Sequence, residues 1–166
     1  PNSGDGLTKA GKNLVKTCND LGIMVDLSHI TEKGFWDVYT ISNKPLVATH
    51  SNVYALSNSA RNLTDDQLKA IRDTDGMVGL NFAVSFLRAD GRAELDTPLS
   101  MMVDHIDYLV DKLGIDRVGF GSDFDGARIP QGIKDVTGLP KLVAALRKRG
   151  YDEKALEKIC YKNWLR

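Results

Sequence analysis

The sequence has few cysteines, no net charge and no long apolar run, and each shortage narrows the possible functions. Its 166 residues contain two cysteines, and 22 basic side chains balance 22 acidic ones. Nucleic acids and anionic membrane surfaces attract clustered lysine and arginine, which a chain of zero net charge does not supply. No stretch approaches the length of a transmembrane helix. We therefore expect neither a nucleic-acid partner nor a membrane partner.

Cysteine placement and chain length favour one reduced, globular unit. Cys18 and Cys160 both lie on apolar helical patterns, which favours buried thiols over a disulfide. The chain begins at Pro1 without an initiator methionine or an apolar targeting stretch, which suggests a processed or excised piece. With 42% hydrophobic residues, residues 1–166 are predicted to form a single domain.

Four short apolar runs are typical of buried β-strands. They cover residues 23–29, 45–50, 77–82 and 117–123. Their character is nearly continuous rather than alternating, as expected of strands that helices cover on both faces. The segments between them are long enough for the crossovers that parallel strands need. The predicted fold class is α/β, with about four parallel strands and intervening helices.

Capping residues predict where the helices begin and end. The first helix should start after Asp5 or Thr8 and stop at Gly22. Thr64, with Gln67 three residues later, forms a predicted capping box. Further helices are expected after Thr31, from about Pro98 to Gly114, from Val136–Pro140 to Gly150, and after Asp152.

Polar side chains stand where the predicted strands end. They are His29, His50, Asn81 and Asp123. In (β/α)8 barrels the chemistry collects at the carboxyl ends of the strands. Four parallel strands do not close a barrel, and an open sheet would expose two unpaired edges. The chain is therefore predicted to be the second half of a barrel, with a metal-binding rim.

Each of these residue types has a structural alternative. A histidine at a strand end is often a hydrogen-bonded structural residue, and His105 falls at helical spacing, which favours a helix-surface or packing role. The run Asp123-Phe124-Asp125-Gly126 could be a turn or a Ca²⁺ or Mg²⁺ site. Arg61 taken alone is typical of a solvated loop cation. Asp26 precedes His29 by three residues and is expected to orient a neighbour rather than bind metal.

A set of short motifs spreads over the whole chain. They are Asp26-Leu27-Ser28-His29, Thr49-His50-Ser51-Asn52, Arg61-Asn62-Leu63-Thr64-Asp65-Asp66, Gly119-Phe120-Gly121-Ser122-Asp123-Phe124-Asp125-Gly126 and the ending Asn163-Trp164-Leu165-Arg166. Together they closely resemble the renal or membrane dipeptidase family, metallopeptidase family M19. The match covers roughly the C-terminal half of that family's catalytic barrel, a TIM-type barrel of the amidohydrolase kind.

The resemblance implies a binuclear zinc site that cleaves dipeptides, including those with a D-residue at the second position. His29 and His50 match the histidines that hold one zinc. The family's remaining ligands, a His-x-Asp pair and a bridging glutamate, have no counterpart in this sequence. Asp123 matches the acid/base aspartate, and Arg61 matches the residue that binds the free carboxylate of the dipeptide.

The resemblance also assigns the substrate pocket and a location. Asn81 and Phe86 are expected to contact substrate, and Phe86 stands where the family often has a tyrosine, which removes a hydroxyl donor. Ser57 replaces a cysteine that forms a disulfide in secreted mammalian members. A bacterial, cytoplasmic protein is therefore expected.

The expected partners are a dipeptide substrate and the missing N-terminal half of the barrel or another chain, with a homodimer when complete. The isolated chain should be a poor catalyst, because a catalytic zinc normally has three protein ligands and a water. Two alternatives remain. One is a different metal-dependent amidohydrolase that would not need Arg61, and the other is a non-catalytic half-barrel that pairs with a second copy.

Overall fold

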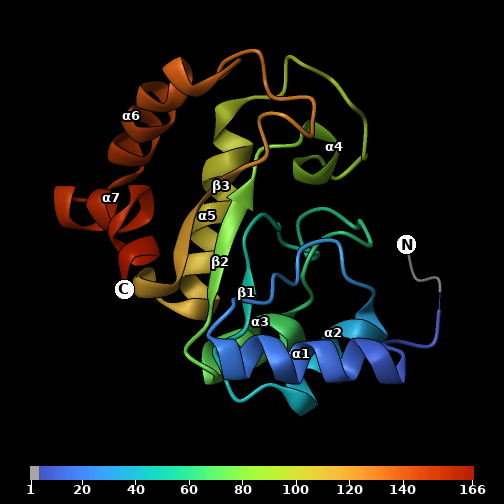
Figure 1. Ribbon diagram of the computed structural model, residues 1–166. Coiled ribbons are helices and arrows are strands. Elements are labelled where there is room, and N and C mark those ends of the chain that lie inside the picture. Colours follow the sequence, from blue (N-terminus) through green and yellow to red (C-terminus); the bar gives the residue numbers. More distant parts are fainter. Residues whose placement is uncertain (1–3) are drawn as a thin grey trace.

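The computed structural model describes residues 4–166, so Pro1 lies outside the described part (Figure 1). Three parallel strands are surrounded by helices. The elements are α1 (Lys9–Leu21), α2 (Glu32–Ile41), β1 (Val47–Ala48), α3 (Asp65–Asp73), β2 (Met77–Asn81), α4 (Val84–Leu87), α5 (Leu99–Leu113), β3 (Val118–Ser122), α6 (Leu139–Arg149) and α7 (Glu153–Cys160), with 3-10 turns η1 (Ile115–Arg117), η2 (Val136–Gly138) and η3 (Lys162–Leu165).

The strands pair in the order β1-β2-β3, all parallel, which confirms the predicted α/β class. Val47 pairs with Met77 and Val78 with Val118. Helix α5 contacts β2 and β3, and α7 also contacts β3. Helix α6 packs on α5 and α7, and α1 packs on α2 at the other side of the molecule (Figure 1). No helix within residues 4–166 combines the length and the apolar character needed to cross a bilayer.

The prediction of a first strand over residues 23–29 is wrong. Only Asp26 forms a bridge, to Val47, so the sheet has three strands rather than about four. One cause is that the Asp26 carboxylate accepts the backbone N–H of Thr49, which takes that donor out of the strand ladder. The other is that residues 23 and 24 are 54% and 56% exposed, with no strand beyond them in the described chain.

The predicted helix starts are confirmed. Thr8, Thr31, Thr64 and Asp152 each accept a backbone N–H from the first turn of the helix that follows. The capping box at Thr64 is complete, because the Gln67 side chain accepts the Thr64 N–H in return. These caps form as predicted because every partner lies within three residues of the cap.

The two cysteines are free, as predicted, but both are only partly buried. His105 is a packing residue with 1% exposure on α5. Its Nδ1 accepts the Val53 N–H at 3.2 Å, and its Nε2–H donates to the Leu87 carbonyl at 3.0 Å. His105 thus supports the segment that follows His50, and its two ring nitrogens are fully used.

The end of the chain is fixed to the sheet by side chains. Asn163 donates to the carbonyl oxygens of Ile115 and Val118, both at 2.8 Å, and the Trp164 indole donates to Phe120 at 3.1 Å. A methyl group on Gly119 would lie 2.6 Å from the Trp164 ring nitrogen. Glycine in β3 therefore leaves the room that Trp164 occupies.

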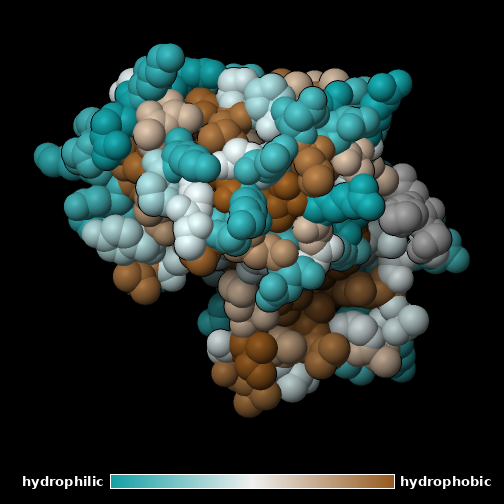
Figure 2. All heavy atoms as spheres, turned by 90° about the horizontal axis from the view of Figure 1, so that it is seen from above, coloured by the Kyte–Doolittle hydropathy of each residue, from teal (hydrophilic) through white to brown (hydrophobic). Residues whose placement is uncertain are grey.

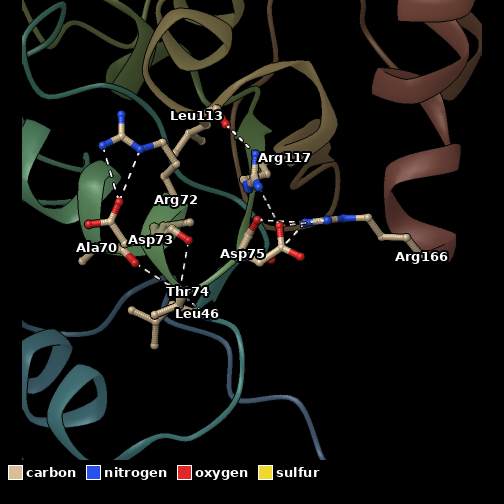
Figure 3. Close-up of polar contacts among 11 residues, drawn as sticks. Leu46, Ala70, Arg72, Asp73, Thr74, Asp75, Leu113, Arg117 and Arg166 are labelled. Carbon is tan, nitrogen blue, oxygen red and sulfur yellow. Dashed lines mark hydrogen bonds and ion pairs between the residues drawn. The ribbon is translucent and has the colours of Figure 1, made fainter.

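Ion pairs close the amino-terminal end of the sheet, just before β2 (Figure 3). Asp75 pairs with Arg117 at 2.8 Å and with Arg166 at 3.2 Å. Arg166 also donates to the carbonyl oxygens of Asp75 and Gly76. The last residue of the chain is thereby held at the turn between α3 and β2.

Candidate active site

The carboxyl-terminal end of the sheet brings three predicted site residues together. His29, His50 and Asp123 each offer one ligand atom, and these atoms all lie within 4.8 Å of one another. The two histidines approach through their Nε2 atoms at 2.8 Å. Their positions come from different segments: His29 follows the Asp26 bridge, His50 follows β1, and Asp123 follows β3. Two imidazoles and a carboxylate form a donor set that suits zinc.

The backbone turns sharply at two of these residues. His29 has φ of +69° and Asp123 has φ of +72°, both in the left-handed region. Such conformations in non-glycine residues concentrate at functional sites, where the surrounding structure holds them in place. Gly126 supports the second turn, because a methyl group there would lie 2.2 Å from the Asp123 Oδ1. Asp125 is exposed and lies outside the group, so the motif contributes one carboxylate to this site.

Asn81 contacts Asp123. Its Oδ1 accepts the Ala83 N–H at 2.7 Å, which turns its Nδ2 toward Asp123 Oδ2 at 3.0 Å. The backbone of Asn81 is held in turn by the side chain of Asn52, through bonds of 2.9 and 3.0 Å. Asn52 is fully buried and was not predicted as a site residue, although it ends the Thr49–Asn52 motif. Substrate contact by Asn81 stays a prediction, since the contact present is with the carboxylate.

Arg61 lies beside the histidines. Its guanidinium contacts His29 Nδ1, and its Cζ lies 5.2 Å from the centroid of the Phe86 ring, so the structure brings two of the three predicted substrate residues, Arg61 and Phe86, together beside the histidines. The buried Arg61 Nε has no hydrogen-bond partner within residues 4–166. Burial, followed by the positive charges of Arg61 and His50, lowers the pKa of His29. A lowered pKa favours the neutral imidazole, the form that binds metal.

Asp26 and Thr49 join the loops that carry the histidines. Asp26 accepts hydrogen bonds from Thr49 and from the Ser28 backbone, and the Thr49 hydroxyl lies 2.7 Å from His50 Nδ1. Burial raises the pKa of Asp26, but these hydrogen bonds outweigh it and leave the pKa below its usual value. The arrangement agrees with the prediction that Asp26 orients a neighbour. Thr49 was not predicted, although it begins a recognised motif.

The surface at this end of the sheet is open. Figure 2 views the molecule from above and shows apolar surface exposed in a hollow beneath a rim of polar residues. Behind Arg61, a cavity of about 300 Å³ lies between α2 and α3, lined among others by Glu32, Tyr54 and Gln67. A parallel sheet with a His/His/Asp group at the carboxyl ends of its strands defines a class of protein, the α/β proteins with a candidate metal centre at the strand ends.

Comparison with known proteins gives the family. The family model of the membrane dipeptidases, peptidase family M19, matches residues 1–166. An uncharacterized protein in the pqqA 5' region of Klebsiella pneumoniae is 54% identical over the whole chain, which covers 61% of that protein. The chain therefore belongs to the membrane dipeptidase family, a family of metallopeptidases, as the motifs predicted.

Solved structures agree with this assignment. The crystal structure of a metallo peptidase from Rhodobacter sphaeroides, liganded with a phosphinate mimic of the dipeptide L-Ala-D-Ala, is 60% identical with a TM-score of 0.97. The probable dipeptidase PvdM from Pseudomonas aeruginosa is 28% identical with a TM-score of 0.91. The chain is covered to 99% in both cases but spans only 47% and 54% of those chains. It thus corresponds to about half of a solved dipeptidase.

Proposed function

We propose that this chain is the C-terminal half of the catalytic (β/α)8 barrel of a zinc-dependent dipeptidase that hydrolyses dipeptides, including L-D dipeptides. One observation carries the proposal: His29, His50, Asp123 and Arg61 come from separate segments and meet at one end of a parallel sheet. The dipeptide mimic bound to the Rhodobacter sphaeroides relative supports the substrate class. Residues 1–166 would then be a single partial domain.

The donor set fits zinc. His29 and His50 would hold one ion of a binuclear site through their imidazole nitrogens, which lie within 4.8 Å of the Asp123 carboxylate. When bound, zinc lowers the pKa of a water molecule and polarises a carbonyl group. The other ligands would come from the half of the barrel that this chain does not contain.

Asp123 would act as the general acid and base. Its carboxylate takes a proton from the attacking water and delivers it to the leaving amine. The 3.0 Å hydrogen bond from Asn81 Nδ2 fixes the direction of this carboxylate.

Arg61 would bind the C-terminal carboxylate of the dipeptide. A guanidinium can bind a carboxylate through two parallel hydrogen bonds, which selects substrates whose C-terminus lies close to the scissile bond. The Phe86 ring lies against the guanidinium and limits its orientation. Together, Arg61 and Phe86 would set the length of the substrate.

The partner we propose is the N-terminal half of the barrel, from the same polypeptide or another, in an enzyme that forms a homodimer when complete. An apolar groove of about 590 Å³ is lined by Ile23, Val25, Val47, Met77 and Trp164 among others. Further strands of a closed barrel would cover this groove. A cytoplasmic location stays a prediction of the sequence.

The experiment is reconstitution. The 166-residue chain is purified alone and with a polypeptide that supplies the rest of the barrel, and zinc content by native mass spectrometry and hydrolysis of L-Ala-D-Ala are measured. We expect zinc-dependent turnover only in the reconstituted protein. Chelator-insensitive turnover by the chain alone would contradict the proposal. Self-association without metal or activity would favour the non-catalytic half-barrel.

The other alternative is a different metal-dependent amidohydrolase. It is favoured by a likeness to an amidohydrolase from Pseudomonas aeruginosa, 30% identical with a TM-score of 0.85. The variant Arg61→Ala separates the two, assayed on dipeptides and on esters without a free carboxylate. A dipeptidase loses dipeptide activity, whereas another amidohydrolase keeps its preferred activity.

A further inference from the structure

The loops that carry His29 and His50 share a carboxylate to which neither family membership nor the proposed catalysis assigns a role. Asp26 Oδ1 accepts the backbone N–H groups of Ser28 and Thr49, both at 2.9 Å. Its Oδ2 accepts the Thr49 hydroxyl at 2.5 Å. The same hydroxyl oxygen lies 2.7 Å from His50 Nδ1. Asp26 therefore reaches His50 through one intervening hydroxyl group.

The chemistry of the three groups determines the direction of each hydrogen bond. A carboxylate only accepts, so the single hydroxyl proton of Thr49 is donated to Asp26. The Thr49 oxygen is then left as an acceptor toward His50, whose Nδ1 must carry the proton. The other ring nitrogen of His50, Nε2, then carries the lone pair. In the metal-free protein this lone pair accepts the N–H of His29 Nε2 at 2.8 Å, inside the group that would hold the metal.

We propose that Asp26 is a positioning residue that fixes the tautomer of His50 through the Thr49 hydroxyl and so presents the Nε2 lone pair to the metal. The inference rests on the proposed function in one respect, that His50 is a metal ligand. Carboxylates often orient metal-binding histidines directly. Here the carboxylate acts one residue further away, and it also connects both ligand loops, because its Oδ1 accepts the backbone N–H groups of Ser28 and Thr49. Ser28 Oγ adds a second connection by accepting the His50 N–H at 2.9 Å.

The substitution Asp26→Asn tests this, because it keeps the shape of the side chain and reverses both hydrogen bonds of the Thr49 hydroxyl. The two backbone N–H groups at Oδ1 require the amide oxygen on that side, so the amide NH₂ faces Thr49. The Thr49 hydroxyl then accepts from residue 26 and donates to His50 Nδ1. The proton of the neutral His50 ring moves to Nε2, the atom that should bind metal.

Two measurements are made on the whole protein that carries this chain. The tautomer of His50 is read by ¹⁵N NMR of metal-free protein at about pH 8, above the ordinary pKa of histidine. Zinc affinity is measured by competition with a chelating dye. We expect the proton on Nδ1 in the wild type and on Nε2 in Asp26→Asn, with zinc affinity weakened by about 10–100-fold in the variant.

The chain offers a matched control. Asp135 Oδ1 accepts the N–H of Thr137 at 3.0 Å and its hydroxyl at 2.5 Å, a similar aspartate–threonine pairing with no histidine beyond it. Asp135→Asn should therefore change neither the tautomer nor the zinc affinity. Thr49→Ser keeps the hydroxyl and should behave as the wild type, whereas Thr49→Val should leave His50 as a mixture of tautomers.

The outcomes separate this inference from the proposed function. A wild-type His50 with its proton on Nε2, or an Asp26→Asn protein that keeps both the Nδ1 proton and the wild-type zinc affinity, would overturn the inference. A wild type that has the Nδ1 proton but binds no zinc would overturn the zinc site and leave the tautomer assignment intact. If Asp26→Asn does not fold, the inference is tested by the His50 tautomer in the wild type and in Thr49→Val.

Discussion

The two ends of the sheet use similar residues for different purposes. At the amino-terminal end, Asp75, Arg117 and Arg166 pair with one another and with backbone carbonyls, so their charges are used within the protein (Figure 3). At the carboxyl-terminal end, His29 and Asp123 converge on a common point from left-handed turns. The first arrangement closes the fold, and the second directs ligand atoms outward. We therefore expect substitutions at the amino-terminal end of the sheet to change mainly stability, and substitutions at the carboxyl-terminal end to change mainly activity.

The largest expected effect comes from Asp123→Asn, assayed in the whole protein. An amide cannot act as a base, so kcat for dipeptides should fall by about 10²–10⁴-fold, the usual contribution of general acid-base catalysis. The melting temperature should stay close to that of the wild type, because Asp123 is only partly buried and, within residues 4–166, its carboxylate accepts one hydrogen bond, from Asn81. Comparable losses of activity and stability would break the separation between the two ends.

The next effect is on substrate selection. Arg61→Ala should lower kcat/KM for dipeptides by roughly 10–100-fold, since a hydrogen bond to a charged group contributes about 1.5–3 kcal/mol. A dipeptide amide, which lacks the carboxylate, serves as the control substrate and should be hydrolysed by both proteins at similar rates. An equal loss on both substrates would mean that Arg61 supports His29 rather than the substrate.

At the opposite end the expected effect is on stability. Asn163→Ala leaves the carbonyl oxygens of Ile115 and Val118 without their donor in a site where Asn163 is 5% exposed. The free energy of unfolding in urea should fall by about 2–3 kcal/mol, because buried polar groups lose their partner. Zinc affinity of the folded protein should not change. The exposed Lys162→Ala provides the neighbouring control.

The smallest expected effect is on the pH dependence of the free energy of unfolding. Burial lowers the pKa of His105 below its usual 6.5, so the unfolded chain binds more protons than the folded one below that pH. Its stabilising contribution is complete above about pH 6.5 and is lost as the pH falls. Urea titrations from pH 7 to pH 5 should show this slope in the wild type and a smaller one in His105→Gln.

The ion pairs of Asp75 at the amino-terminal end of the sheet should affect stability at a lower pH than His105 does. The pKa of Asp75 lies below its usual 3.8, with the hydrogen bond from Arg166 as the main cause. Its contribution is present above that pH and is lost only as the pH falls through the lowered value. The variant Asp75→Asn should therefore leave the slope between pH 7 and pH 5 unchanged, and a reduced slope would contradict the assignment to His105.

The sequence by itself determined the helix starts, the parallel pairing and the family. The caps at Thr8, Thr31, Thr64 and Asp152 were predictable because each partner lies within one helical turn. The apolar runs at β2 and β3 were predictable because strands covered on both faces have little freedom in composition. The motifs around His29, His50 and Asp123 carried the family assignment.

Only the tertiary structure decided how those residues act on one another. Residues 23–29 form a single bridge because the Asp26 carboxylate takes up the Thr49 N–H, a donor on another segment of the chain. The roles of Thr49 and Asn52 likewise depend on contacts with partners far along the chain, such as Asp26 and Asn81. A residue's type limits which bonds it can form, but the partner it finds depends on how distant segments pack, which no local pattern specifies.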